Sequence, residues 1–144
     1  RRIEGGIFGN LTDIDTTITP FEAGLGFFVN MDKEDFIGRD ALANKDRRPC
    51  LFGITCKSDT PVSGSKVLEK NKIVGHITAG IPSPTLKLGI GYVRFYEPKD
   101  WPGRELMLEL PNGQRYSCNV VNLPFFDHDK KIVKGIDRTI PSNI

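Results

Sequence analysis

Two histidines and a pair of closely spaced aspartates are the side chains of this sequence best suited to acid–base or metal chemistry. His76 and His128 are far apart in the sequence, and neither has a cysteine or carboxylate at the spacing of zinc ligands. Asp13 and Asp15 could act as paired carboxylates, but the threonines beside them favour a turn held by side-chain hydrogen bonds. The sequence therefore predicts no catalytic residue and no metal site in this chain.

The three cysteines are expected to be reduced and to pack in the core. Cys50 and Cys56 would lie about 20 Å apart on one extended strand, which is beyond the reach of a disulfide. Their number is odd, and unpaired cysteines are usual in the reducing cytoplasm, where they commonly behave as small apolar side chains. We therefore expect packing roles for Cys50, Cys56 and Cys118, and a cytoplasmic location.

Charge and hydropathy argue against two classes of partner. The net charge of +2 over 144 residues is too small and too scattered to form a nucleic-acid-binding face. No apolar run is long enough to cross a bilayer, and the N-terminus does not resemble a signal peptide. Because the chain lacks an initiator Met and opens in what reads as a helix end, we expect it to be a fragment of a longer protein.

Short apolar segments separated by turn residues follow from Arg48 onward, which is typical of an all-β unit. Ser83-Pro84 has the form of an N-cap followed by a first-turn proline, so one helical turn is expected over 84–87. The predicted strands are 51–57, 65–69, 73–81, 88–96, 105–110 and 115–123, and their tight antiparallel connections favour a small closed barrel or a sandwich. Trp101, in the loop between the fourth and fifth of these strands, is expected to anchor that loop over the barrel surface.

The first 48 residues carry weaker signals. Residues 1–8 read as a helix end, and an Asp/Thr-rich loop follows up to about residue 20. Asp32 is a plausible N-cap for a short helix over Lys33 to Asn44, with carboxylates in its first turn. Gly38 opposes that helix by about 1 kcal/mol.

Three motifs occur in series along the chain. They are Arg2-Ile3-Glu4-Gly5-Gly6, the run from Thr19 to Leu42 (TPFEAGLGFFVNMDKEDFIGRDAL) and Ser83-Pro84-Thr85-Leu86. In this order they resemble the C-terminal part of the glycine-cleavage T-protein (aminomethyltransferase) family, whose members are tetrahydrofolate-dependent one-carbon transferases. The resemblance runs from Arg2 to about Asp127, which is nearly the whole chain.

The resemblance implies a mainly β fold, a six-stranded Greek-key barrel with one or two short N-terminal helices. Residues 1–48 would be the end of the folate-binding domain plus an inter-domain connector, and residues 49–144 the C-terminal β-barrel domain with an extended tail. The apolar side chains of the connector are then expected to pack against neighbours: Phe21, Leu25, Phe27 and Phe28.

The resemblance also implies tetrahydrofolate as cofactor and Arg2 as the cofactor-binding residue, since Arg2 occupies the position of the family's cleft-facing arginine. A guanidinium offers a planar fork of donors to a pterin edge or a carboxylate. The family's catalytic aspartate would lie in a missing N-terminal catalytic portion, so this chain alone is expected to be inactive. The other partners implied are a small-molecule one-carbon donor or a lipoyl carrier protein, with no nucleic acid and no membrane.

Two departures from the family leave alternatives open. The loop between Gly9 and Pro20 has two extra residues, Leu11-Thr12, and a long tail runs to Ile144. One alternative is therefore a demethylase of the dimethylsulfoniopropionate type, or the folate-binding tail of a sarcosine or dimethylglycine dehydrogenase. A second is a non-catalytic barrel binding module of the kind found in translation factors, although the weak charge argues against RNA.

Overall fold

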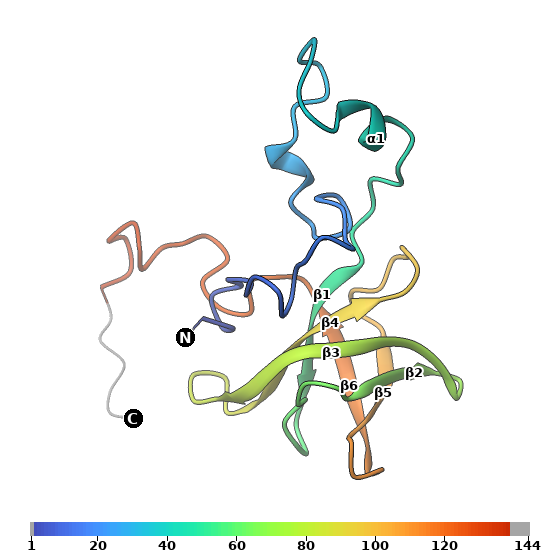
Figure 1. Ribbon diagram of the computed structural model, residues 1–144. Helices are drawn as coiled ribbons and strands as arrows, with labels where there is room; N and C mark the ends of the chain where they lie inside the picture. Colours follow the sequence, from blue (N-terminus) through green and yellow to red (C-terminus); the bar gives the residue numbers. More distant parts are fainter. Residues whose placement is uncertain (1, 139–144) are drawn as a thin grey trace.

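Six antiparallel strands close into a barrel in the computed structural model, which describes residues 2–138 (Figure 1). Their order around the barrel is β1-β4-β3-β2-β5-β6, and β6 pairs back onto β1. Because β2, β3 and β4 follow one another through hairpins while β1 lies beside β4, the connectivity is a Greek key. The strands are β1 (Leu51–Cys56), β2 (Lys66–Glu69), β3 (Lys72–Ser83), β4 (Leu88–Phe95), β5 (Glu105–Glu109) and β6 (Arg115–Val121). The mainly β barrel expected from the sequence is confirmed.

The connections between strands follow from their turn residues. Lys70 and Asn71 both have positive φ, 49° and 66°, as a two-residue hairpin between β2 and β3 requires. After β3, the Ser83 hydroxyl accepts a hydrogen bond from the Leu86 amide at 3.0 Å, so Ser83 caps the single turn predicted over 84–87. Strand β3 reaches Ser83, two residues beyond the predicted end.

Trp101 lies inside the barrel, so the sequence-based placement on its surface was wrong. Its side chain is 1% exposed and stacks on Phe95 with ring centroids 3.9 Å apart and an interplanar angle of 8°. The indole Nε1 donates to the Glu97 carbonyl at 3.0 Å, which satisfies its polar group. The indole can therefore join the apolar core without leaving a buried polar group unpaired. The sequence of the loop alone does not reveal this hydrogen bond.

The connector before β1 contains a 3-10 turn, η1 (Gly26–Phe28), and one short helix, α1 (Arg39–Ala43). The predicted helix over Lys33 to Asn44 was wrong in extent, because Gly38 has φ 90° and serves as the N-cap of α1. Asp32 instead lies in a turn, where its amide donates to Asn30 Oδ1 at 3.0 Å. Within the described residues, no helix has the length and apolar composition needed to span a membrane.

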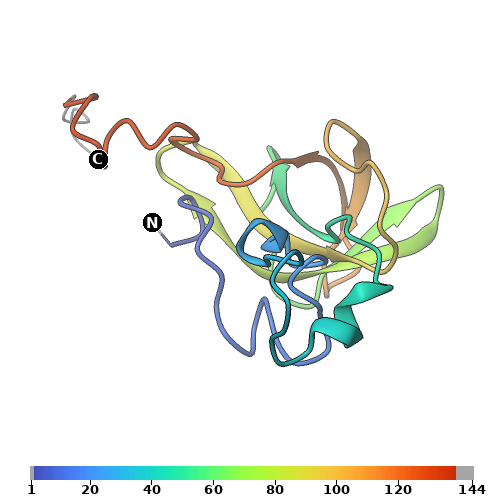
Figure 2. The same ribbon diagram turned by 90° about the horizontal axis from the view of Figure 1, so that it is seen from above.

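The connector and the barrel differ in how they bury apolar side chains. Phe21 is buried as expected, but Phe27 and Phe28 are 78% and 75% exposed, and Ile37 is fully exposed. The expectation that these two phenylalanines pack on neighbours was therefore wrong within residues 2–138. In Figure 1 the connector stands above the barrel end where β1 begins, and in Figure 2 the C-terminal segment extends away from the barrel.

Candidate functional site

A six-residue turn at the N-terminus positions Arg2 and Glu4 against the barrel. The Gly6 amide donates to the Ile3 carbonyl at 3.0 Å, and the Ile7 amide donates to the Arg2 carbonyl at 3.1 Å. Gly6 has φ 71°, so this is the glycine-terminated pattern that closes helices. The predicted helix end is present here as a turn.

Asp13 is the centre of a buried polar cluster that joins this turn to the barrel. Its side chain is fully buried, and its Oδ2 accepts hydrogen bonds from Arg2 Nη1 at 2.8 Å and from the Gly9 amide at 2.7 Å. Its Oδ1 accepts from the Thr78 hydroxyl at 2.6 Å. Thr78 falls at the register shift between Ile77 and Ala79 in β3, and such a bulge re-aims a side chain. Arg2, Asp13 and Thr78 are called the Asp13 cluster below.

The two aspartates considered as a pair have different roles. Asp15 follows the turn expectation, since its Oδ1 accepts from both the amide and the hydroxyl of Thr17, at 2.8 and 2.6 Å. These bonds, together with the positive charge of Arg94, lower the pKa of Asp15. Asp13 does not follow it, because its carboxylate is paired with Arg2. Neither is placed to act as an acid–base partner of the other.

Tyr92 in β4 contacts the N-terminal turn from the barrel side. Its ring is fully buried, and its hydroxyl lies 3.1 Å from the Ile7 carbonyl, to which it donates. Burial raises the pKa of Tyr92, so the phenol stays protonated and remains a donor. The guanidinium carbon of Arg2 lies 5.8 Å from the centre of the same ring, and Phe8 meets its edge.

Arg2, the residue expected to contact folate, is anchored on one side only. Both of its hydrogen bonds use Nη1, to Asp13 and to the Ile7 carbonyl at 2.9 Å. Nη2 and Nε have no hydrogen-bond partner among residues 2–138, and the side chain is 42% exposed. The buried carboxylate thus fixes the guanidinium while part of its donor fork remains available.

Glu4 attaches the same turn to the end of β3. Its Oε1 accepts hydrogen bonds from the Ser83 hydroxyl and, at 3.3 Å, from the Thr85 amide. Burial alone would raise the pKa of Glu4, but these hydrogen bonds outweigh burial and lower the pKa below its ordinary value. The conspicuous Ser83-Pro84-Thr85-Leu86 motif is therefore a docking point for Glu4.

Replacing Glu4 by Gln is expected to lower the free energy of unfolding by about 1–2 kcal/mol at neutral pH, because charge-assisted hydrogen bonds are lost. A depressed folded-state pKa stabilises above the unfolded pKa, and that contribution is lost as pH falls through the folded value. The wild-type advantage over Glu4→Gln should therefore shrink between pH 6 and pH 3 in urea titrations. Glu34→Gln, at an exposed connector position, should leave the pH dependence unchanged; a pH-independent Glu4→Gln effect would contradict the assignment.

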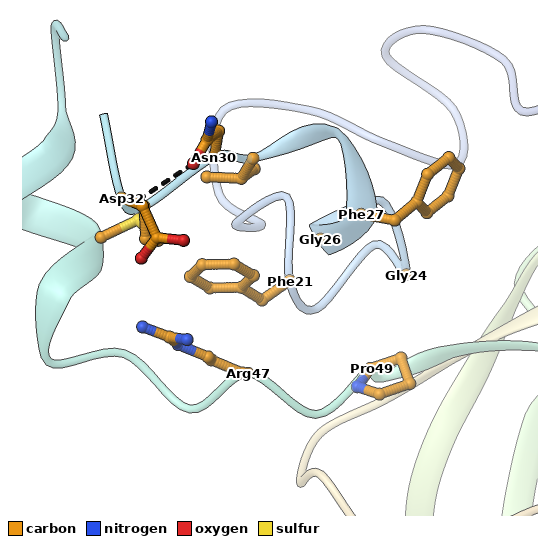
Figure 3. A pocket seen from close by; sticks show the side chains of 10 residues that line it. Phe21, Gly24, Gly26, Phe27, Asn30, Asp32, Arg47 and Pro49 are labelled. Atoms are coloured by element: carbon orange, nitrogen blue, oxygen red, sulfur yellow. Dashed lines mark hydrogen bonds between the residues drawn. The ribbon is translucent and has the colours of Figure 1, made fainter.

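A separate pocket of about 460 Å³ lies in the connector (Figure 3). Phe21 forms its centre, with the guanidinium carbon of Arg47 5.7 Å from the ring centre, and Figure 3 shows Asp32 on the other side of the ring. Arg2 is not part of its lining, so the structure does not bring the sequence-predicted residue to this pocket. A cation, a carboxylate and an aromatic face can bind a ligand, and the lining holds no serine, threonine, cysteine, lysine or histidine.

Other titratable residues have structural surroundings. His76 lies on β3 beside Tyr96, with ring centres 5.8 Å apart, and burial together with the charge of Arg94 lowers its pKa. Among residues 2–138, no group of three histidine, cysteine or carboxylate side chains could hold a metal ion. The arrangement can therefore bind and position, and the described residues contain no constellation for covalent or acid–base catalysis.

Sequence reasoning missed Asp13, Thr78 and Tyr92 as members of the site. The predicted strand over 73–81 included no bulge, whereas the bulge at Thr78 interrupts the two-residue alternation of a regular strand. The small residues Ala79 and Gly80, directly after Thr78, were the available signal, because a glycine inside a strand often marks a bulge.

Comparison with known proteins finds one consistent set of relatives. The family model of the glycine cleavage T-protein C-terminal barrel domain matches residues 48–127. An aminomethyltransferase of Streptomyces coelicolor is 34% identical over 139 residues, covering 90% of this chain and 37% of that protein. One from Alkaliphilus oremlandii is 44% identical over 84 residues, covering 56% of this chain and 23% of that protein.

A solved structure extends the likeness to three dimensions. The crystal structure of glycine cleavage system aminomethyltransferase T from Bartonella henselae superposes with a TM-score of 0.76 at 25% identity. The match covers 88% of this chain and 37% of that chain. The matched region is thus little more than a third of the Streptomyces and Bartonella proteins and less than a quarter of the Alkaliphilus protein. Because the structural match covers 88% of this chain, it includes residues of both the connector and the barrel.

Proposed function

The chain belongs to the glycine cleavage T-protein family through its C-terminal barrel domain, and from this we propose that it is the C-terminal part of a tetrahydrofolate-dependent aminomethyltransferase. The whole protein would move a one-carbon unit from a donor onto tetrahydrofolate, which supplies the accepting amine. The observation that carries this proposal is that similarity to aminomethyltransferases extends over 90% of the chain, well beyond the barrel strands.

We propose that Arg2 contacts the folate. Its guanidinium is fixed through Nη1 to Asp13 and Ile7, which removes much of the entropy cost of ordering a long side chain on binding. Nη2 and Nε, unpaired within residues 2–138, match the paired acceptors of a pterin edge or a glutamate carboxylate. The residues present therefore fit the ligand. Within the Asp13 cluster, Arg2 would make the contact with the folate, and Asp13 and Thr78 would hold Arg2 in position.

The barrel would act by packing on a catalytic portion that this chain does not contain. Phe27 and Phe28, whose ring centres lie 4.0 Å apart, and Ile37 are exposed on the connector, and large apolar exposures commonly mark interfaces. The catalytic aspartate would reside in that portion, with a lipoyl carrier protein or a small molecule as donor. These residues alone are expected to give no transferase turnover, and turnover by them would contradict the proposal.

The test is calorimetric titration of the full-length protein with tetrahydrofolate. Arg2→Ala is expected to weaken binding by about tenfold or more, since a charged hydrogen bond contributes roughly 1.5–3 kcal/mol. Arg2→Lys should keep Asp13 neutralised but lose the planar fork, so it should recover stability without full affinity. Arg104→Ala is the matched control, because that arginine is also 42% exposed and salt-bridged, at 2.9 Å to Glu69 on the barrel.

The two parts of the proposal fail in different ways. Unchanged affinity in a folded Arg2→Ala protein would remove Arg2 from the site while leaving the transferase assignment intact. Absence of any tetrahydrofolate binding by the wild-type protein would overturn the transferase assignment itself. Melting temperatures of all variants, measured without ligand, separate loss of contact from loss of fold.

A further inference from the structure

Two cysteines face each other across the line where the barrel closes. Strands β1 and β6 pair through Gly53 with Val121, Ile54 with Val120 and Thr55 with Asn119. The next position in this register places Cys56 opposite Cys118. Both side chains are buried in the same barrel core cluster, so they point to the same side of the sheet.

The hydrogen-bond pattern shows which kind of pair they form. The Val120 carbonyl accepts from the Gly103 amide at 2.8 Å, and the Val120 amide donates to the Arg104 carbonyl at 3.0 Å. Both polar groups of Val120 thus point away from β1, so Ile54 and Val120 form a non-hydrogen-bonded pair. The pattern repeats every two residues, which makes Cys56 and Cys118 a pair of the same kind.

Non-hydrogen-bonded pairs have the spacing that a disulfide needs. Their Cα atoms are typically about 4.5 Å apart, at the short end of the roughly 4.4–6.8 Å range of disulfides. The Cys56 thiol already reaches across the junction, since its Sγ donates to the Ser117 carbonyl at 3.5 Å, next to Cys118. The Cys118 thiol donates to the Leu106 carbonyl at 3.3 Å, so both thiols are ordered.

We propose that Cys56 and Cys118 are a redox-sensitive pair that forms an intramolecular disulfide across the β1–β6 junction when the protein meets a low-molecular-weight disulfide. Cys56 lies at the end of β1 and reacts first: its thiolate attacks one sulfur of the oxidant and releases one thiolate. The Cys118 thiolate then attacks the Cys56 sulfur of the mixed disulfide and releases the second. Two protein thiols lose two protons and two electrons, and the oxidant is reduced to two thiols.

The surroundings make this reaction slow in the closed barrel. Burial, with the nearby Cys56 second, raises the pKa of Cys118 to about 12, so its thiolate is scarce until the junction opens. The ladder between β1 and β6 contains only three residue pairs, against six between β1 and β4, which makes this junction the easier side of β1 to open. Once formed, the bond would close the chain between residues 56 and 118 and hold the junction shut.

Cys50 provides an internal comparison. It is also a buried free thiol, and burial raises its pKa to about 11, but it precedes β1 and has no cysteine opposite it. Cys50 should therefore remain reduced under conditions that oxidise the other two. A general susceptibility of buried thiols would oxidise all three cysteines alike.

The experiment treats the whole protein with oxidised glutathione, traps free thiols under denaturing conditions and maps peptides by mass spectrometry. A peptide linked through Cys56 and Cys118, and lost on reduction, is expected, together with alkylated Cys50. The oxidised protein should melt about 5–10 °C higher than the reduced protein. Cys50→Ala should still form the link, whereas Cys118→Ala should form neither the link nor the melting shift.

Two results would overturn the proposal. One is complete alkylation of Cys56 and Cys118 after prolonged oxidation at a temperature where the junction opens. The other is a disulfide that involves Cys50 or a second molecule in place of the expected link. Because the peptide map is made on the wild-type protein, failure of a core variant to fold does not remove the test.

Discussion

Replacing Trp101 by alanine is expected to destabilise the barrel by about 3–5 kcal/mol, the range for large aromatic side chains removed from a core. The ring is 1% exposed and stacked on Phe95, and its Nε1 proton satisfies the Glu97 carbonyl. Its removal leaves a cavity in the main core cluster and frees the loop between β4 and β5. Urea unfolding followed by circular dichroism measures the change in the free energy of unfolding.

Two variants separate the possible sources of this effect. Trp101→Phe keeps an aromatic ring on Phe95 and loses only the indole hydrogen bond and part of the volume. This variant should therefore recover about half of the stability that Trp101→Ala loses. Tyr96→Ala removes an aromatic residue that is 60% exposed in the neighbouring loop and should cost less than about 1 kcal/mol. A Trp101→Ala cost as small as that of Tyr96→Ala would show that the indole is not part of the core.

The strands could be predicted because their signals are local. Turn residues such as Lys70-Asn71 and the Gly113 turn mark the hairpins directly, and all six predicted strands overlap the observed ones. The short helix was less predictable, because carboxylates after Asp32 signal a helix start whereas Gly38 adopts a left-handed conformation that delays it. Local signals competed there, and the glycine determined the outcome.

The Asp13 cluster could not be predicted because it depends on long-range placement. Asp13 and Thr78 are 65 positions apart, and the bulge that aims the Thr78 hydroxyl has only a weak signature in the sequence. The resemblance to a family suggested Arg2 as a folate contact, but it gave no account of what fixes the Arg2 guanidinium. The structure supplies that account, since a buried carboxylate, a backbone carbonyl and the face of Tyr92 all constrain one side chain.

The exposure of Phe27 and Phe28 also could not be predicted from the local sequence. Phe27 and Phe28 are large apolar residues, and such residues are usually buried. They are exposed within residues 2–138 while Phe21, six residues earlier, is buried beneath Arg47. A sequence pattern can identify an apolar side chain, but it cannot show whether the described residues cover that side chain.

Replacing Gly80 by alanine is expected to destabilise the protein by about 3 kcal/mol or more, because a backbone segment occupies the space of the new methyl group. A Cβ on Gly80 would lie 1.6 Å from the Pro61 carbonyl oxygen and 2.8 Å from its carbon. Gly89 has the same relation to the Asp59 carbonyl oxygen, at 2.2 Å. Residues 59–61 thus lie directly on the backbone of β3 and β4, and neither partner can yield by a side-chain rotation.

Gly64→Ala is the matched control for Gly80→Ala, and the comparison tests how the barrel supports the proposed folate contact. Gly64 has φ 83° and open space around it, so its alanine variant should cost only about 1 kcal/mol of backbone strain. Gly80→Ala should in addition release residues 59–61, seen as faster trypsin cleavage after Lys57, because the loop must move to admit the methyl group. Thr78 lies two residues before Gly80 on the same strand, so displacement of β3 should also loosen Asp13 and weaken tetrahydrofolate binding. Equal costs for the two variants, with no new cleavage, would mean that the loop does not clamp the strands that hold Arg2 in place.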